Sequence, residues 1–149
     1  MRELINIVLL TLLVAVVMFC VTPPKKKVIH VSALQIHDIL NSGNALFLDA
    51  RPFEEYAEGH IEGAINIPIH DASGMDLIFK LEDMLQSAPQ LVLYCNGEDC
   101  ELSDILAKKL KDFGISEKKI LVFKGGIEEW KQSGYPVSTD TEFQKLLLQ

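Results

Sequence analysis

Residues 48–68 read LDARPFEEYAEGHIEGAINIP, and they place a strand, a helix and a second strand within one short stretch. The apolar run 45–48 predicts a strand. Segment 52–58 begins with a proline, which suits the first turn of a helix, and we expect this helix to stop at Gly59. The run 64–67 is closed by another proline and predicts the next strand. The stretch therefore indicates a chain in which strands and helices alternate.

The rest of the folded part continues this alternation in both directions. The run 91–94 is fully apolar, which predicts a strand covered on both faces. Segment 101–113 has helical spacing, with Leu102, Ile105, Leu106 and Leu110 on one face. The other expected elements are strands over 28–31 and 120–123, a helix that Ser32 caps and that runs to residue 41, helices over 76–86 and 127–132, and a frayed helix over 142–149. We therefore predict an α/β fold, with helices on both faces of a mainly parallel sheet.

At the N-terminus, residues 4–21 contain no charged side chain and show no polar stripe. A helix of this length spans about 27 Å, close to the hydrocarbon thickness of a bilayer. We expect residues 1–22 to be a transmembrane anchor or a signal segment. The run ends in bulky side chains rather than the small ones of a cleavage site, which favours an uncleaved anchor. Residues 23–27 then form a linker, 28–138 the folded domain and 139–149 a C-terminal tail.

The expected location is the cell membrane, with a single crossing through residues 4–21. The side that the domain faces stays open. Lys25, Lys26 and Lys27 favour the cytoplasm by the positive-inside rule. Short N-terminal anchors, however, commonly export the domain behind them, and two neighbouring cysteines suit an oxidising compartment.

The charge of the chain excludes one class of partner. Without Arg2, Glu3 and Lys25 to Lys27, the chain holds 10 basic and 20 acidic residues, a formal net charge of −10. A surface this acidic repels polyanions, so we expect no nucleic-acid partner. The cysteine pair and the scattered His30, His37, His60 and His70 lack the spacing of a metal site. We expect no metal and no cofactor.

Cys95 is the candidate nucleophile, because it directly follows the apolar run 91–94. Ligands of parallel α/β sheets bind at the carboxyl ends of the strands. The loop amides and the positive end of the next helix would face the sulfur, which would stabilise a thiolate and lower its pKa. The alternative is that Cys95 is simply a small buried hydrophobic residue.

Three motifs in order along the chain resemble those of the rhodanese family. The first is the stretch 48–68, with its Asp-x-Arg and its GHIEGAINIP segment. The others are FKGGIEEW at 123–130 and GYPV at 134–137, and the cysteine lies between the first motif and these two. The resemblance covers about residues 28–138 and implies the rhodanese fold.

The resemblance also implies a sulfurtransferase, in which a cysteine accepts a sulfane sulfur, becomes a persulfide and passes the sulfur to a thiol or protein acceptor. By this resemblance Cys95 carries the sulfur, and the substrate-binding loop consists of Asn96, Gly97, Glu98 and Asp99, up to Cys100. Asp49 and Arg51 are expected at a neighbouring strand end, as a structural ion pair or helix cap rather than in direct catalysis. His60 is expected to be an interior hydrogen-bonding residue.

The loop departs from the family pattern in its charge and in its second cysteine. Glu98 and Asp99 would repel an entering dianion, so we expect thiosulfate to be a poor donor and favour a polysulfide or another protein's persulfide. Cys100 is a candidate resolving thiol that could attack a persulfide on Cys95, release hydrosulfide and leave a disulfide. The alternative for Cys100 is a helix cap that never meets Cys95.

Other classes of protein also have to be considered. A cysteine-based phosphatase needs an arginine six residues after its cysteine, and this position is Glu101, which excludes that class. A thiol–disulfide oxidoreductase and a non-enzymatic rhodanese-like binding module stay open as alternatives to the sulfurtransferase.

Overall fold

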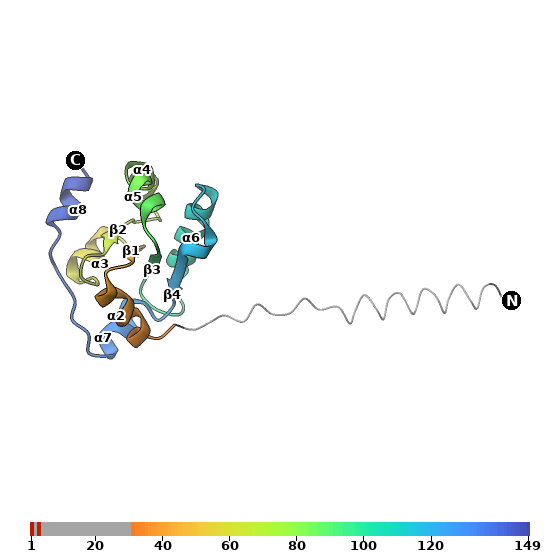
Figure 1. Ribbon diagram of the computed structural model, residues 1–149, viewed down its shortest axis with the longest axis horizontal. Coiled ribbons are helices and arrows are strands. Elements are labelled where there is room, and N and C mark those ends of the chain that lie inside the picture. Colours follow the sequence, from red (N-terminus) through yellow and green to blue (C-terminus); the bar gives the residue numbers. More distant parts are fainter. Residues whose placement is uncertain (2, 4–30) are drawn as a thin grey trace.

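Four parallel strands form the sheet of the computed structural model, in the order β2-β1-β3-β4 (Figure 1). The two central strands are β1 (Leu46–Asp49) and β3 (Leu91–Tyr94), and the edge strands are β2 (Ile65–Asn66) and β4 (Ile120–Phe123). Leu48 lies opposite both Ile65 and Leu93, which fixes the register at the centre of the sheet. The predicted parallel sheet is confirmed, and the strand over 91–94 has the predicted bounds.

The structure describes residues 1, 3 and 31–149. The predicted membrane segment 4–21 and the linker 23–27 lie outside these residues, and so does the predicted strand over 28–31, apart from Val31. Val31 itself lies in no strand. Within the described part of the chain, no helix has the length and apolar character that crossing a membrane requires.

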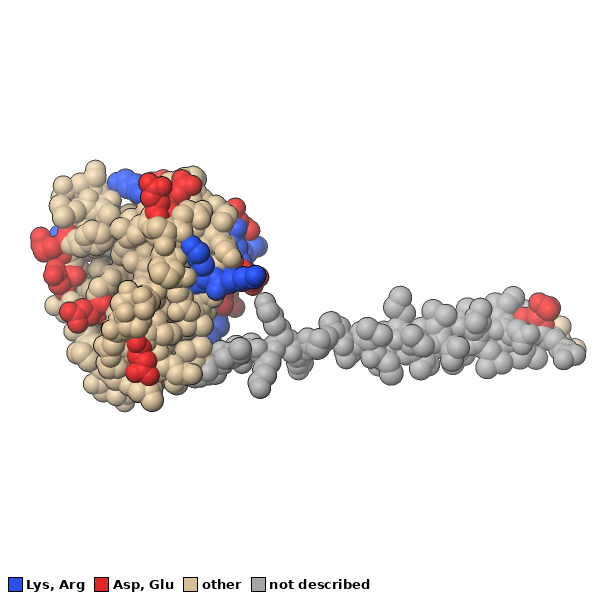
Figure 2. Space-filling view, in the orientation of Figure 1, with Lys and Arg blue, Asp and Glu red and all other residues tan. Residues whose placement is uncertain are grey.

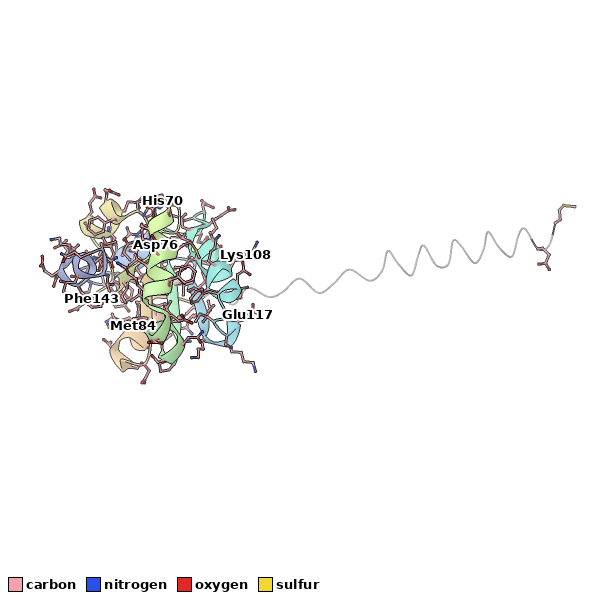
Figure 3. The ribbon with its side chains drawn as sticks, turned by 90° about the horizontal axis from the view of Figure 1, so that it is seen from above. His70, Asp76, Met84, Lys108, Glu117 and Phe143 are labelled. Carbon is pink, nitrogen blue, oxygen red and sulfur yellow. The ribbon has the colours of Figure 1, made fainter. Side chains whose placement is uncertain are left out.

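Helices cover both faces of the sheet, as predicted. Figure 1 shows α4, α5 and α6 on one side of the strands and α2 and α7 on the other. Viewed from above, α4 and α5 lie between α8, which carries Phe143, and α6, which carries Lys108 (Figure 3). The bounds are α2 (Ala33–Ser42), α3 (Phe53–Glu58), α4 (Ala72–Lys80), α5 (Glu82–Ser87), α6 (Leu102–Asp112), α7 (Gly126–Gln132) and α8 (Glu142–Leu147), with a 3-10 turn over Glu117–Lys119.

The predicted signals at the ends of α2 and α3 are confirmed. Ser32 caps α2, and its side chain and that of Gln35 each accept a hydrogen bond from the other residue's backbone, a capping box. Gly43 ends α2 in the left-handed conformation, with φ of 65°. Pro52 stands at the start of α3 and Gly59 at its end.

The side chains of β3 alternate between two hydrophobic clusters, one on each face of the sheet. Leu91 and Leu93 pack with the buried side chains of α4, α5 and α6. Val92 and Tyr94 pack with those of α2 and α7. Cys95, the next residue, continues this alternation and belongs to the α6 side. The alternation of side chains along the strand therefore places the Cys95 side chain on the face of the sheet that α6 covers.

The single helix predicted over 76–86 is wrong, because the structure has two helices there. The first, α4, begins at Ala72, after Asp71 caps it by accepting a hydrogen bond from the Ser73 amide. Leu81 separates α4 from α5 with φ of −97° and ψ of 9°. Its amide still bonds to the Leu77 carbonyl, so the two helices follow almost without interruption.

The predicted apolar face of α6 is wrong at one position. Ile105 is 40% exposed. Ser103 and Ala107 are buried instead, together with Leu106 and Leu110. These four positions form a continuous stripe at helical spacing, and the two small side chains in it allow α6 to lie close to the sheet beside Cys95.

The C-terminal tail forms α8 and is tied to the sheet edge rather than frayed. The side-chain oxygen of Gln144 accepts a hydrogen bond from the Asn66 backbone N–H at 2.8 Å, and its amide nitrogen donates to the Asn66 carbonyl at 2.9 Å. Gln144 is buried, and Asn66 belongs to the edge strand β2. The tail thus satisfies backbone groups that β2 leaves without a strand partner.

Acidic side chains outnumber basic ones in the chain, 21 to 14. Figure 2 shows acidic side chains scattered over the visible face of the domain, with basic ones at its top and on its right half. This distribution agrees with the negative charge counted from the sequence.

Candidate active site

Cys95 lies at the carboxyl end of the central strand β3, where the sequence predicted it. Its side chain is 1% exposed. The loop after it leads to α6, whose first turn lies beside the cysteine through Ser103. This is the ligand-binding edge of a parallel sheet, beside the positive end of a helix.

The Cys95 thiol is held in a buried hydrogen-bonded position. Its sulfur donates to the backbone carbonyl of Cys100 at 3.2 Å, and the Ser103 hydroxyl lies 3.4 Å from it. Burial raises the pKa of the Cys95 thiol, and the hydrogen bond with the Cys100 side chain raises it further, whereas the Ser103 hydroxyl and amide lower it. The predicted lowering of this pKa is wrong, because burial and the neighbouring Cys100 side chain favour the protonated form of the sulfur.

The N-terminus of α7 holds the loop in place. The amide of Ile127 donates to the Cys95 carbonyl and that of Glu128 to the Asn96 carbonyl, each at 2.9 Å. Gly126 has φ of 57°, and a Cβ there would lie 2.4 Å from the Cys95 carbonyl oxygen. Only glycine combines this backbone conformation with so close an approach. Gly126 and Ser103 are site residues that sequence reasoning missed, although Gly126 belongs to the FKGGIEEW motif.

A pocket of about 630 Å³ opens between the loop and α7. Cys100 lines it, whereas Cys95, which is also described in the structure, does not. The lining residues come from the predicted substrate-binding loop and from α7, and they are Asn96, Gly97, Glu98, Asp99, Cys100, Gly125, Glu128, Glu129 and Gln132. Four of these nine carry carboxylates and none carries a basic side chain. Sequence reasoning found the acidic loop residues but not the two carboxylates that α7 adds.

Asp49 and Arg51 form a buried ion pair, as the structural interpretation predicted. The Arg51 Nη2 atom lies 2.6 Å from the Asp49 carboxylate, and Nε donates to both of its oxygens at 3.0 and 3.1 Å. Arg51 also donates to the Gly59 carbonyl at 2.9 Å, and its guanidinium lies 6.0 Å from the centre of the Tyr94 ring. The pair therefore ties the end of β1 to the end of α3 beside β3.

His60 has the interior role that was predicted. It is buried, its ring stacks on that of Tyr56 with centroids 3.8 Å apart, and Nδ1 lies 2.9 Å from the Tyr56 carbonyl. Its backbone pairs with Ser138, which joins this segment to the chain after α7. Over residues 31–149, no group of three or more His, Cys, Asp or Glu side chains is placed to hold a metal ion.

The comparison with known protein families agrees with this geometry. Residues 32–133 match the family model of the rhodanese-like domain. The chain belongs to the rhodanese-like family. Its two cysteines in the loop after β3, Cys95 and Cys100, fit a variant of that family.

The rhodanese-like chain is similar to parts of longer proteins. It is 35% identical over 96 residues to an HTH-type transcriptional regulator of Mycobacterium tuberculosis, a match of 64% of this chain and 38% of that protein. It is 33% identical over 119 residues to an adenylyltransferase and sulfurtransferase of Meyerozyma guilliermondii, a match of 75% of this chain and 27% of that protein. The chain thus spans about a third of the length of these two relatives.

A solved structure shows the same fold. The rhodanese-like domain of an Anabaena protein is 27% identical and superposes with a TM-score of 0.58, covering 76% of this chain and 80% of that one. The α/β rhodanese fold, with a parallel sheet between helices, is therefore common to both.

Proposed function

We propose that this chain is a sulfurtransferase that carries sulfane sulfur as a persulfide on Cys95. The observation that carries the proposal is the position of the Cys95 sulfur, at the carboxyl end of β3 beside the first turn of α6. A relative that is 33% identical over 119 residues is named an adenylyltransferase and sulfurtransferase, which supports the same activity.

The reaction requires the thiolate form of the cysteine. The Cys95 thiolate attacks the outer sulfur of a donor persulfide R–S–SH, the S–S bond breaks, and R–S⁻ leaves with the electron pair. An acceptor thiolate then attacks the outer sulfur of the Cys95 persulfide and regenerates the Cys95 thiolate. No electrons are gained or lost over the cycle.

The surroundings of Cys95 indicate how its two protonation states differ. The thiol donates to the Cys100 carbonyl, and a thiolate has no proton with which to do so. Deprotonation therefore weakens the hold of this carbonyl on the sulfur. The Ser103 hydroxyl and the positive end of α6 then stabilise the negative charge.

The acidic pocket favours donors other than thiosulfate. Glu98, Asp99, Glu128 and Glu129 surround the space that a donor enters. A dianion approaching these carboxylates is repelled even after screening by water and salt. We propose a polysulfide or the persulfide of another protein as the donor, and a thiol or a protein as the acceptor.

A thiol–disulfide oxidoreductase is the second candidate, because Cys100 belongs to the same loop and its carbonyl touches the Cys95 sulfur. Cys100 as a thiolate would attack the inner sulfur of a Cys95 persulfide. The products are a Cys95–Cys100 disulfide and hydrosulfide, so the sulfane sulfur is reduced and the two cysteines are oxidised.

We also propose that residues 4–21 tether the domain to the cell membrane as a single-pass anchor. The absence of charged residues from this run and its length support the proposal. Extraction of the full chain from membranes with alkaline carbonate tests it. An anchored chain stays in the membrane pellet, whereas recovery in the supernatant contradicts the anchor. Protease protection in sealed vesicles then reports the side.

Mass spectrometry of the purified full chain tests the chemistry. After treatment with a polysulfide or a low-molecular-weight persulfide, we expect one added sulfur atom that digestion maps to Cys95, and no added sulfur on the peptide around position 95 in Cys95→Ser. Loss of two hydrogens that depends on both Cys95 and Cys100 would identify the oxidoreductase instead. If neither change occurs, the binding-module alternative is the better description.

A further inference from the structure

The two loop cysteines differ in exposure, although both pack in the hydrophobic cluster on the α6 side. Cys100 is half-buried and lines the 630 Å³ pocket. Cys95 is 1% exposed and contacts Ser103 of α6. A donor that enters the pocket therefore meets the residue that carries the Cys100 sulfur before it meets Cys95.

The loop nevertheless brings the two cysteines together. The Cys100 amide donates to the Gly97 carbonyl at 3.0 Å, which turns the chain back toward the end of β3. In this turn the Cys100 carbonyl lies 3.2 Å from the Cys95 sulfur. Both cysteines are free thiols. A sulfur atom bound to Cys100 thus needs only a local movement of this loop to reach Cys95.

We propose that sulfur enters the protein through Cys100 and is then relayed to Cys95. The inference rests on the proposed sulfurtransferase function and adds the order in which the two thiols act. Cys100, which lines the pocket, is the entry thiol. Cys95 is the storage thiol, whose persulfide is kept away from solvent.

The relay is balanced in atoms and electrons. The Cys100 thiolate attacks the outer sulfur of R–S–SH, and R–S⁻ leaves, which gives Cys100–S–SH. The Cys95 thiolate then attacks the outer sulfur of this persulfide, the Cys100 S–S bond breaks, and Cys100 leaves as a thiolate. Cys95–S–SH results. Each step exchanges one S–S bond for another, so neither an oxidant nor a reductant is consumed.

Proximity to Cys100 explains why the buried Cys95 can react by this route. Burial raises the pKa of Cys95 and keeps most of it protonated at neutral pH, which slows its reaction with a dilute donor in solution. Delivery from a neighbour in the same loop makes the second step intramolecular, and well-oriented intramolecular reactions reach effective molarities of about 10⁵ M or more. Such a gain offsets a small thiolate fraction.

Rapid-quench labelling of the full chain with glutathione persulfide tests the order of the two steps. Samples are alkylated at successive times and digested, and the added sulfur is assigned to individual cysteines by mass spectrometry. In the unmodified chain, the persulfide is expected on Cys100 first and on Cys95 later. In Cys95→Ser, Cys100 is expected to gain sulfur at the same initial rate as in the unmodified chain.

The matched variant Cys100→Ser keeps the size of the side chain and removes the entry thiol. Sulfur loading of Cys95 is expected to slow at least about tenfold in this variant. A thermal unfolding midpoint equal to that of the unmodified chain, measured alongside, shows that the slowing reflects lost chemistry rather than lost folding.

The outcomes separate the relay from the function on which it rests. Loading of Cys95 at an unchanged rate in Cys100→Ser overturns the relay and leaves the sulfurtransferase intact. Sulfur that stays on Cys100 and never reaches Cys95 overturns the relay and the assignment of Cys95 as carrier. Absence of added sulfur from both cysteines in the unmodified chain overturns the proposed function itself.

Discussion

The Ser103 hydroxyl lies 3.4 Å from the Cys95 sulfur, and both side chains are almost completely buried. Ser103 belongs to the first turn of α6, so this contact links the helix to the candidate nucleophile. The hydroxyl can donate to a thiolate, which lowers the pKa of Cys95 against the larger effect of burial. Ser103 is therefore a positioning residue for the sulfur.

The first prediction concerns the pH dependence of Cys95. Because its pKa is raised, the thiolate fraction at neutral pH is small and increases about tenfold per pH unit until the pKa is reached. Ser103→Ala removes a hydrogen bond worth about 1 kcal/mol, so alkylation of Cys95 by iodoacetamide at pH 8 is expected to slow about fivefold. The pH profile of alkylation should move to higher pH.

Ser87→Ala provides the control for this prediction. Ser87 is exposed at the end of α5, and its hydroxyl donates a hydrogen bond to the Met84 carbonyl of the same helix. Its alkylation profile should equal that of the unmodified chain. An unshifted profile in Ser103→Ala would show that the hydroxyl has no influence on the sulfur.

The second prediction concerns the charge of the pocket. The combined variant Glu98→Gln, Asp99→Asn and Glu128→Gln removes three of the four carboxylates that line it. We expect kcat/KM for thiosulfate in the thiosulfate–cyanide assay to rise about tenfold, equivalent to about 1.4 kcal/mol of reduced repulsion. Added salt should raise the activity of the unmodified chain more than that of the variant, because it screens charges that the variant lacks.

Glu62→Gln changes an exposed carboxylate outside the pocket and should leave thiosulfate use unchanged. Rapid turnover by the unmodified chain at a modest thiosulfate concentration would contradict the role assigned to the acidic pocket.

The third prediction compares two ion pairs. Asp49→Asn leaves the buried Arg51 with only the more distant Glu55 carboxylate, 4.0 Å away, as a charged partner, which is expected to lower the free energy of unfolding by about 3–5 kcal/mol. Asp104→Asn breaks the pair with Lys124 at the surface, where a cost of less than about 1 kcal/mol is expected. Urea denaturation of both variants measures the difference, and equal costs would show that the Asp49–Arg51 pair adds nothing through its burial.

The fourth prediction compares two glycines that share a positive φ. Gly126→Ala places a Cβ 2.4 Å from the Cys95 carbonyl oxygen, whereas Gly134→Ala, with φ of 80°, meets no atom within 4 Å. Backbone strain alone costs about 1–2 kcal/mol, and overpacking adds about 1–3 kcal/mol at Gly126. Gly126→Ala should therefore be the less stable variant in urea denaturation, and sulfur loading of Cys95 should also slow. Equal stability of the two variants would mean that the loop shifts to accommodate the added Cβ at position 126 without an energetic cost.

The strands were predictable because short apolar runs between turn residues leave few alternatives. Over 91–94 all four side chains are buried, and the run and the strand coincide. The break between α4 and α5 was not predictable in this way. Leu77, Leu81 and Leu85 follow one another at helical spacing and are all buried, so the pattern continues across a point where the backbone bends.

The position of the site could be predicted from the sequence, but the protonation state of Cys95 could not. Cys95 could be placed because it directly follows a buried strand, and the sequence of the loop shows the acidic residues around it. The pKa of Cys95 depends on how deeply the sulfur is buried and on which groups contact it, and the fold of the loop decides both rather than its composition. Ser103 is eight positions further along the chain, and its contact with the sulfur depends on the rotation of α6 about its own axis.

The paired hydrogen bonds between Gln144 and Asn66 have a consequence for how the protein behaves in a crowded solution. An exposed sheet edge offers unpaired N–H and C=O groups to the strands of other molecules, which is a common start of aggregation. In this chain a side-chain amide of α8 occupies one such donor and acceptor on β2, in the manner of a neighbouring strand. Trimming by a protease before α8 would uncover this edge, and the domain would then be prone to self-association even with its core and its cysteine loop intact.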